Sequence, residues 1–221
     1  MILRRLWSDT PLLPAPPIST RLAAMAIGWG AVGVIYGISG LRGPESAFHL
    51  TPSAIDLWFR FDPTAIWAYL SFFLLVPLGY LASTPERLVW LMRAMVLCAL
   101  GAGLVFAIFP TTMSFPPTPT TGVSAGMLAA LIRVDTLVNC LPSLHVALSL
   151  ICAAALWDAK KPWRMVALIV WLAVICLSIL QLQRHQFVDL LAGAALALWA
   201  GLVLRALGVP LRLFAPVARG R

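Results

Sequence analysis

The sequence predicts an all-α integral membrane protein whose six transmembrane helices form a core helix bundle, and three observations support this fold class. First, 61% of the 221 residues are hydrophobic and 11% are charged, whereas a soluble domain has about 45–50% apolar and about 25% charged residues. Second, six apolar runs approach the roughly 20 residues that a helix needs to cross a bilayer. Third, the basic residues concentrate on one of the two sides that six spans create.

The six apolar runs are separated by three short and two long connections. They are Leu22–Ser39, Thr64–Leu81, Val89–Phe109, Leu141–Trp157, Trp163–Leu182 and Phe187–Leu207. The predicted membrane domain therefore covers residues 21–207, between an N-terminal tail, residues 1–20, and a basic C-terminal tail, residues 208–221. The N-terminal tail has no uninterrupted apolar core of the kind found in a signal peptide, so we expect it to be retained.

The Lys and Arg residues predict the orientation of the bundle. With the N-terminus in the cytoplasm, twelve of the sixteen lie on cytoplasmic segments, and the outer side holds only Arg42, Arg60, Arg133 and Arg184. Both termini are therefore predicted to be cytoplasmic. This anchoring explains the net charge of +8. We expect no nucleic-acid binding, because no basic stripe with interleaved aromatic residues is present.

Two segments on the predicted outer side are longer than simple turns. His49–Pro63 begins with a Thr-Pro helix signal and carries three aromatic residues, which predicts a short interfacial helix. Phe109–Asn139 is rich in Pro and Thr, which predicts a loop, with a second interfacial helix after Gly122. Loops of this length in compact proteins are usually functional or disordered. Because this one leads directly into a polar motif, we expect it to be functional.

That polar motif is CLPSLHVA, residues 140–147. Pro142 suits the first turn of a helix, which would place Ser143, Leu144 and His145 around the N-terminal end of the fourth span. Free backbone N–H groups and the helix dipole make such an end an anion-binding site, with the Ser143 hydroxyl as an added donor. Cys140 and the three cysteines within spans are expected to be small core residues rather than disulfides.

A second polar motif, RHQFVDLLAG, occupies residues 184–193. His185 and Asp189 are four residues apart at the start of the sixth predicted span, a spacing that would place them on one helix face. The carboxylate could accept a hydrogen bond from one ring nitrogen and leave the other as a nucleophile. An ionisable group within a span is costly and tends to mark a functional site. Both motifs lie on the same side of the membrane, which predicts a single site.

Two other interpretations of these residues are open at this point. A histidine at a helix end is often a satisfied interfacial residue without a chemical role. A metal site with two His ligands and one Asp ligand is the competing chemistry, with His49 or Asp135 as a fourth ligand. We favour catalysis by the side chains themselves and expect neither a metal nor a cofactor.

The two motifs resemble the second and third signature motifs of the type-2 phosphatidic acid phosphatase superfamily. Pro-Ser-Leu-His and the upstream segment FDPTAIWAYLSFFLLVPLGY are more similar to its inositol-phosphorylceramide-synthase-like branch. The resemblance covers about residues 55–205. It implies a six-helix fold and a metal-independent mechanism with a phosphohistidine intermediate.

The resemblance also implies a role for each motif residue. His185 would attack phosphorus and Asp189 would orient it. His145 would protonate the leaving alcohol and later activate the acceptor. Ser143 and the Leu144 amide would hold phosphate oxygens.

The chain departs from the phosphatase branch of this superfamily in its cations. That branch has a Lys and an Arg-Pro pair before the Pro-Ser-x-His turn, and an Arg six residues before the second His, where this chain has Ile179. Arg184 and Arg133 are the nearest substitutes in the sequence. A phosphomonoester carries a charge of about −1.5 to −2 at neutral pH, whereas a phosphodiester carries a single negative charge. A site with few cations therefore favours a diester substrate.

The sequence thus predicts a membrane lipid phosphatase or phosphotransferase, favouring transfer of a phospholipid headgroup to a hydroxyl acceptor. One alternative is a lipid phosphomonoester or polyprenyl diphosphate phosphatase. Another is a non-catalytic lipid transporter or scaffold of the same fold. The expected partners are a lipid phosphate or phospholipid substrate and the surrounding membrane lipids. The expected location is the bacterial inner membrane, with the active site facing the periplasm or the outside.

Overall fold

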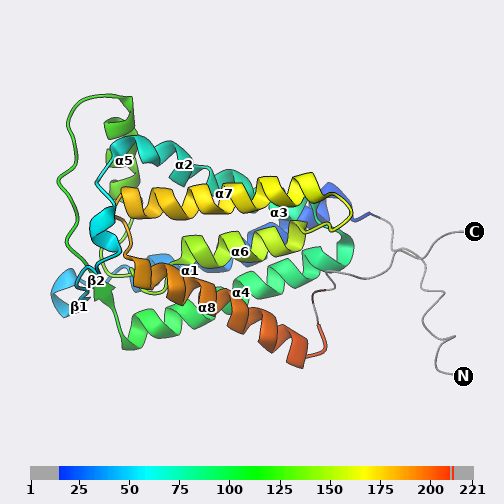
Figure 1. Ribbon diagram of the computed structural model, residues 1–221. Coiled ribbons are helices and arrows are strands. Elements are labelled where there is room, and N and C mark those ends of the chain that lie inside the picture. Colours follow the sequence, from blue (N-terminus) through cyan, green and yellow to red (C-terminus); the bar gives the residue numbers. More distant parts are fainter. Residues whose placement is uncertain (1–14, 210, 212–221) are drawn as a thin grey trace, which may run out of the picture.

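The computed structural model describes residues 15–209 and residue 211, and it is a bundle of helices (Figure 1). About 69% of the described residues are helical, which confirms the all-α class. The helices are α1 (Ile18–Ser39), α2 (Ile66–Leu70), α3 (Phe72–Ala82), α4 (Pro85–Ile108), α5 (Val123–Val134), α6 (Leu144–Leu156), α7 (Pro162–Gln181) and α8 (Phe187–Ala206). Residues 1–14, 210 and 212–221, which make up most of the two predicted tails, lie outside the described residues.

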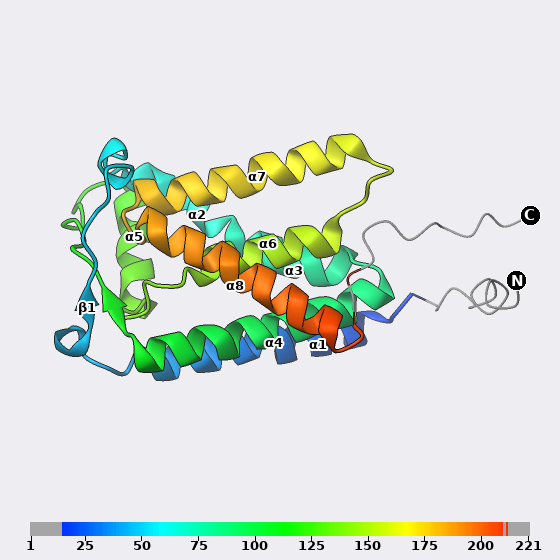
Figure 2. The same ribbon diagram turned by 60° about the horizontal axis from the view of Figure 1, so that its bottom comes forward.

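A small parallel sheet stands at one end of the bundle. Strand β1 (Phe48–His49) pairs with β2 (Thr111–Thr112), and α5 lies at the same end of the bundle. We call this the sheet end of the bundle. Helix α1 begins and α8 ends at the opposite end, which we call the tail end (Figures 1 and 2).

Five helical stretches of the described chain are long and apolar enough to cross a membrane, as expected for an integral membrane protein. They agree with five of the six predicted spans and are Ile18–Ser39, Pro63–Ala82, Pro85–Ile108, Pro162–Gln181 and Phe187–Ala206. The second stretch is not one continuous helix, because α2 and α3 are separated at Ser71. The Ser71 hydroxyl there donates to the Ala68 carbonyl oxygen and accepts from the Trp171 indole.

The remaining predicted span, Leu141–Trp157, is shorter than expected. Helix α6 has 13 residues, which is about 20 Å of helix at about 1.5 Å per residue, against a hydrocarbon core of about 30 Å. Pro142 does not lie in its first turn, contrary to the prediction. The helix begins at Leu144, with Ser143 as its N-cap.

The late start of α6 recesses its N-terminus within the bundle. Figure 2 shows α6 in the middle of the bundle, beginning well short of the sheet end that α7 and α8 reach. The segment before it, residues 138–143, is non-helical, yet five of these six residues are buried. Irregular backbone is tolerated at membrane depth only where protein or a cavity surrounds it. The segment therefore belongs to the interior of the protein.

The two segments at the sheet end differ in how well the sequence predicted them. The helix after Gly122 is confirmed as α5, and Gly122 precedes it with a φ of +94°. The prediction of one interfacial helix in His49–Pro63 is wrong. That segment holds the end of β1 and a 3₁₀ turn, Asp56–Trp58. Asp56 Oδ1 accepts a hydrogen bond from the backbone N–H of Phe187 at 2.6 Å, so the segment serves to cap α8 instead.

Close contact joins the first turns of α6 and α8 inside the bundle. The Ser143 N–H donates to the Asp189 carbonyl oxygen at 3.0 Å. Gly193 permits this approach, since a Cβ at that position would lie 2.4 Å from the Ser143 carbonyl oxygen. The obstruction is backbone rather than a flexible side chain, so only glycine fits without moving a helix.

We therefore expect Gly193→Ala to destabilise the protein by about 1–3 kcal/mol, the usual cost of overpacking a well-packed core. Gly201→Ala is the matched control on the same helix, because its Cβ would meet nothing nearer than Trp90 at 3.9 Å. Thermal unfolding of both variants in the same detergent measures the difference. Equal melting temperatures for the two variants would contradict the proposed backbone contact.

Candidate active site

His185 lies in the turn between α7 and α8, two residues before the first residue of α8. Its Nδ1 atom is 2.8 Å from the Cys140 carbonyl oxygen and 3.4 Å from Asp189 Oδ2. A carbonyl oxygen only accepts hydrogen bonds, so this contact places the ring proton on Nδ1. The lone pair of the neutral ring is then on Nε2, which is the atom available for attack.

The reason that His185 and Asp189 come together differs from the prediction. They do not share a helix face, because His185 precedes α8. Asp189 is the third residue of α8, and its Oδ2 atom accepts from the Gln186 N–H at 2.8 Å in a capping box. Its side chain is fully buried, and its Oδ1 atom has no hydrogen-bond partner. Asp189 therefore caps the helix while lying close to the imidazole.

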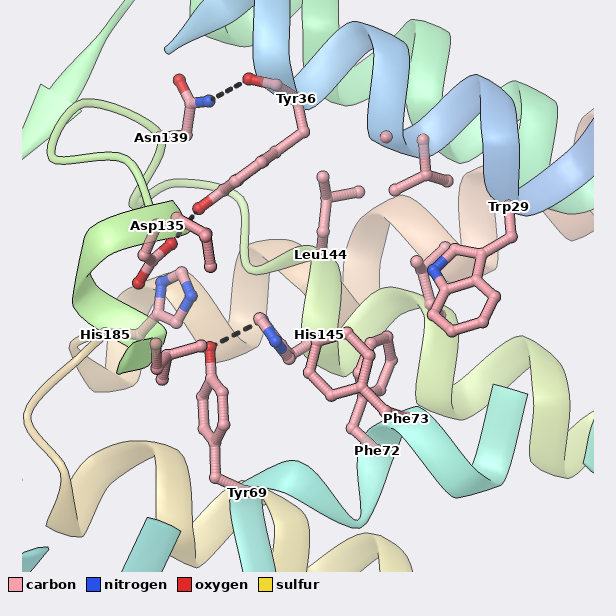
Figure 3. Close-up of a pocket in the computed structure, with 15 residues that line it drawn as sticks. Trp29, Tyr36, Tyr69, Phe72, Phe73, Asp135, Asn139, Leu144, His145 and His185 are labelled. Atoms are coloured by element: carbon pink, nitrogen blue, oxygen red, sulfur yellow. Dashed lines mark hydrogen bonds between the residues drawn. The ribbon is translucent and has the colours of Figure 1, made fainter. Parts of the chain in front are cut away.

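His145 is the second residue of α6, and aromatic rings surround it. Its ring centroid is 4.5 Å from that of Tyr69 and 4.7 Å from that of Phe72. The His145 Nδ1 atom is 3.5 Å from the Tyr69 hydroxyl. The His145 and His185 ring centroids are 6.1 Å apart. The two histidines thus face each other from different elements, as Figure 3 shows.

Both histidines line one pocket of about 220 Å³. Its walls come from α1, α2, α3, α5, α6 and the two motif segments, and most of its lining is aliphatic or aromatic. Its residues are Trp29, Val32, Gly33, Tyr36, Tyr69, Phe72, Phe73, Leu131, Val134, Asp135, Asn139, Leu144, His145, Leu148 and His185. Among these described residues there is no Lys or Arg.

Ser143 is the N-cap of α6, two residues before His145, and it does not itself line the pocket. The Ser143 side chain is fully buried, and its hydroxyl has no hydrogen-bond partner. The residue that follows it, Leu144, lines the pocket. The first N–H groups of a helix have no partner within the helix, and they favour an anion. A buried hydroxyl without a partner at such an N-terminus is a ready donor for an oxyanion.

Arg184 is buried and bound to a carboxylate. Its side chain is 5% exposed, and its Nη2 and Nε atoms lie 2.6 and 3.1 Å from Asp135 Oδ2. The Phe115 ring covers the guanidinium at 4.5 Å. The Arg184 side chain therefore does not extend toward lipid headgroups. Its charge is held inside the protein, next to His185 in the chain, and is largely neutralised by Asp135.

Asp135 is the centre of this buried cluster. Its other carboxylate oxygen accepts a hydrogen bond from the Tyr36 hydroxyl of α1 and one from the Thr136 N–H at 3.0 Å. Burial opposes ionisation of the carboxyl, but the Arg184 charge and the hydrogen bonds from Tyr36 and Arg184 outweigh it. The pKa of Asp135 therefore lies below its ordinary value. The cluster joins α1 and α5 to the turn that carries His185.

Other predicted residues lie away from the pocket. Arg133 is exposed in the last turn of α5 and does not line the pocket. His49 lies in β1, and its Nε2 atom is 3.2 Å from the Ser114 hydroxyl. No group of three or more His, Cys, Asp or Glu side chains in the described part of the chain is arranged to hold a metal ion. Asp135, a suggested fourth ligand, is committed to Arg184.

Two residues that position His185 were missed by sequence reasoning. The Cys140 carbonyl is its nearest partner, yet a carbonyl oxygen leaves no trace in a sequence. Thr111 holds the segment in front of α6: its carbonyl and hydroxyl oxygens accept from the Cys140 and Leu141 N–H groups at 3.3 and 2.8 Å. The Cys140 side chain itself is buried, 2% exposed.

The fold and the site together define a class: an all-α integral membrane protein with two histidines facing each other at a recessed helix N-terminus. A family model described as the PAP2 superfamily, the type-2 phosphatidic acid phosphatases, matches residues 60–203. This is well over half of the chain and includes both motifs, so the chain belongs to the PAP2 superfamily. Membership supports a function of the lipid phosphatase type. No curated protein and no solved structure matches the chain.

Because Arg184 and Asp135 form a buried ion pair, we expect Asp135→Asn to destabilise the folded protein strongly. The amide can still accept hydrogen bonds, but it leaves the Arg184 charge buried without a counter-charge, which costs about 3–5 kcal/mol. Adding Arg184→Gln should restore part of this loss, because the uncompensated charge is then removed. Unfolding measurements on the single and double variants check this. A double variant no more stable than Asp135→Asn alone would contradict the charge argument.

The pH dependence follows from the lowered pKa of Asp135. A carboxyl with a lowered folded-state pKa contributes its full stability above its unfolded value of about 3.9, and loses it as pH falls through the folded value. The stability difference between the parent and Asp135→Asn should therefore be constant from pH 8 to about pH 5 and shrink only below about pH 4. A difference that changes near pH 6 would point to a histidine instead.

Proposed function

We propose that this protein transfers a phospholipid headgroup phosphate to a hydroxyl acceptor or to water through a phosphohistidine on His185. The observation that carries this proposal is the hydrogen bond from His185 Nδ1–H to the Cys140 carbonyl oxygen. It leaves Nε2 as a nucleophile that faces His145, 6.1 Å away between ring centroids. The Pro-Ser-Leu-His motif favours the inositol-phosphorylceramide-synthase-like branch of the superfamily.

The reaction proceeds in two displacements at phosphorus. His185 Nε2 attacks, the bond between phosphorus and the lipid alcohol oxygen breaks, and protonated His145 gives its proton to that oxygen. His145, now neutral, then removes a proton from the acceptor hydroxyl or water, whose oxygen attacks phosphorus. The N–P bond breaks, the phosphorylated product leaves, and both histidines return to their starting states.

Charge developing on the phosphoryl oxygens is met by the N-terminus of α6. The free Ser143 hydroxyl and the Leu144 N–H are the proposed donors, acting with the positive end of the helix dipole. The buried Asp189 carboxylate, 3.4 Å from His185 Nδ1, stabilises the positive imidazole ring of the intermediate. Arg184 adds a guanidinium beside the site, although Asp135 already holds it.

The small number of free positive charges favours a diester substrate over a monoester. No Lys or Arg among the described residues lines the pocket. Arg184, the nearest cation in the sequence, is paired with Asp135, and Arg133 is exposed elsewhere. A phosphomonoester brings up to about two negative charges, whereas a diester brings only one. We therefore propose headgroup transfer ahead of monoester or diphosphate hydrolysis.

We further propose that the site faces the periplasm or the outside of a bacterial inner membrane, in a six-span domain over residues 21–207. Helix α6 with its flanking irregular segments would be the fourth span. In the described chain, seven of eleven Lys and Arg residues lie toward the tail end. This distribution favours a cytoplasmic tail end. The tails, residues 1–20 and 208–221, would then be cytoplasmic.

A substrate panel tests the proposed reaction. The purified protein in lipid nanodiscs is given phospholipid diesters with several headgroups, phosphatidic acid, and a polyprenyl diphosphate, each with a hydroxyl lipid acceptor. Headgroup transfer or release from a diester is expected to exceed phosphate release from the monoester or diphosphate. Faster monoester or diphosphate hydrolysis would favour the phosphatase alternative. No turnover with any substrate would favour the transporter or scaffold.

His185→Ala should lower turnover to background, because no other group can replace the nucleophile. His49→Ala is the matched control: it removes the same side chain at the sheet end, but His49 does not line the pocket. Steady-state rates of both variants against the most active diester, with equal amounts of inserted protein, provide the measurement. If His185→Ala kept a tenth of the parental activity, His185 could not be the nucleophile.

Activity should also be independent of metal ions, since all proposed steps use side chains and backbone groups of this chain. Dialysis against a strong chelator should leave the rate within about twofold of the untreated enzyme. Elemental analysis of the same sample monitors bound metal. A rate that collapses on chelation and returns with one divalent ion would establish the metal alternative instead.

A further inference from the structure

The pocket extends well beyond the two histidines. Trp29, Val32, Gly33 and Tyr36 form one wall, and their spacing places them on one face of α1. From Tyr36 to Trp29 is seven residues, which is about 10 Å along the helix axis. Figure 3 shows the two ends: Asp135 and His185 lie on one side, and Trp29 and Phe73 on the other.

The chemistry of the lining changes along this length. Its polar groups gather at the histidine end, where Asp135, Asn139 and the two histidines lie. The far end is formed by aromatic rings and aliphatic side chains. There the Trp29 and Phe73 ring centroids are 6.0 Å apart. A ligand that fills the pocket therefore needs a polar end at the histidines and an apolar part that runs from them.

The apolar part of the pocket lies at hydrocarbon depth and reaches the side of the bundle. Trp29 is ten residues from Ser39, the last residue of α1, which is about 15 Å along the helix and half of a hydrocarbon core of about 30 Å. Two residues that line this part, Phe73 and Gly33, are exposed, Phe73 by 40%. Others, such as Leu148 at 1%, are deep inside. The pocket thus connects the histidines with the surrounding lipid.

We propose that this apolar arm of the pocket, from Tyr36 to Trp29 and Phe73, binds the part of a hydrocarbon chain nearest the headgroup of the lipid substrate. The chain reaches it sideways from the bilayer, between α1 and α3. This proposal rests on the proposed function and adds a site for the chain. It makes α1, which lies entirely outside the matched family region, a determinant of substrate specificity.

Gly33 is the residue of α1 that keeps this arm open. It lines the pocket and is exposed, and a Cβ at this position would meet no atom within 4 Å. A larger side chain at position 33 would therefore fill space that belongs to the pocket without colliding with the protein. Gly30 is a matched position: it is also exposed and equally free of neighbours, but it does not line the pocket.

The first test compares Gly33→Leu with Gly30→Leu on a long-chain phospholipid and its dibutanoyl form with the same headgroup. Gly33→Leu should lower kcat/KM for the long-chain lipid by about 15- to 60-fold, as expected if two or three chain methylenes are no longer buried. Its kcat/KM for the dibutanoyl form should stay within about threefold of the parent. Gly30→Leu should affect neither substrate. Equal losses on both substrates in Gly33→Leu would overturn the chain site.

The second test does not depend on turnover. A phospholipid with a photoactivatable group in its chain is irradiated with the protein in nanodiscs, and labelled residues are mapped by mass spectrometry. Label is expected on Leu148 and Phe72, which line the pocket and are 1% and 4% exposed. Gly33→Leu, but not Gly30→Leu, should reduce it at least fivefold. Absence of label at both residues would overturn the chain site, whether or not the substrate panel shows headgroup transfer.

Discussion

The site depends on the contact between the first turns of α6 and α8, where the Ser143 N–H donates to the Asp189 carbonyl oxygen at 3.0 Å. His145 follows Ser143 by two residues, and His185 precedes Asp189 by four, so this contact sets the separation of the two imidazoles. Gly193 makes it possible, since a Cβ there would lie 2.4 Å from backbone. The same approach brings the Cys140 carbonyl to His185 Nδ1 and thereby fixes the proton on that nitrogen.

A second network connects the site to the helix that forms the wall of the pocket. Tyr36 lines the pocket and donates to Asp135, and Asp135 in turn holds Arg184 next to the nucleophile. The cation at the site is thus fixed by a carboxylate rather than free for a phosphate dianion. A pocket with little net positive charge at one end and aromatic rings at the other suits a membrane lipid with a singly charged phosphate. In the proposed function, connected elements of the protein would recognise the charge and the chain of the lipid.

Much of the fold and part of the site could be predicted from the sequence, because composition and apolar run length report directly on burial in a membrane. Five long helical stretches, α5, and the meeting of the two motifs followed from these signals. The start of α6 after Ser143 could not be predicted in this way, because Pro142 is equally compatible with a helix start and with the irregular segment found here. The pairing of Arg184 with Asp135 joins residues 49 positions apart, and the Cys140 carbonyl has no side-chain signature. Such tertiary and backbone contacts cannot be deduced from local pattern.

The central claim is that His185 reacts through Nε2 because the Cys140 carbonyl holds the proton on Nδ1. The most direct test is to trap the phosphorylated protein during turnover of the best lipid substrate and to identify the modified nitrogen. Tandem mass spectrometry assigns the residue, and ³¹P NMR of the digest, against both phosphohistidine isomers, assigns the nitrogen. We expect phosphate on Nε2 of His185. Phosphate on Nδ1, or on another residue, would contradict it.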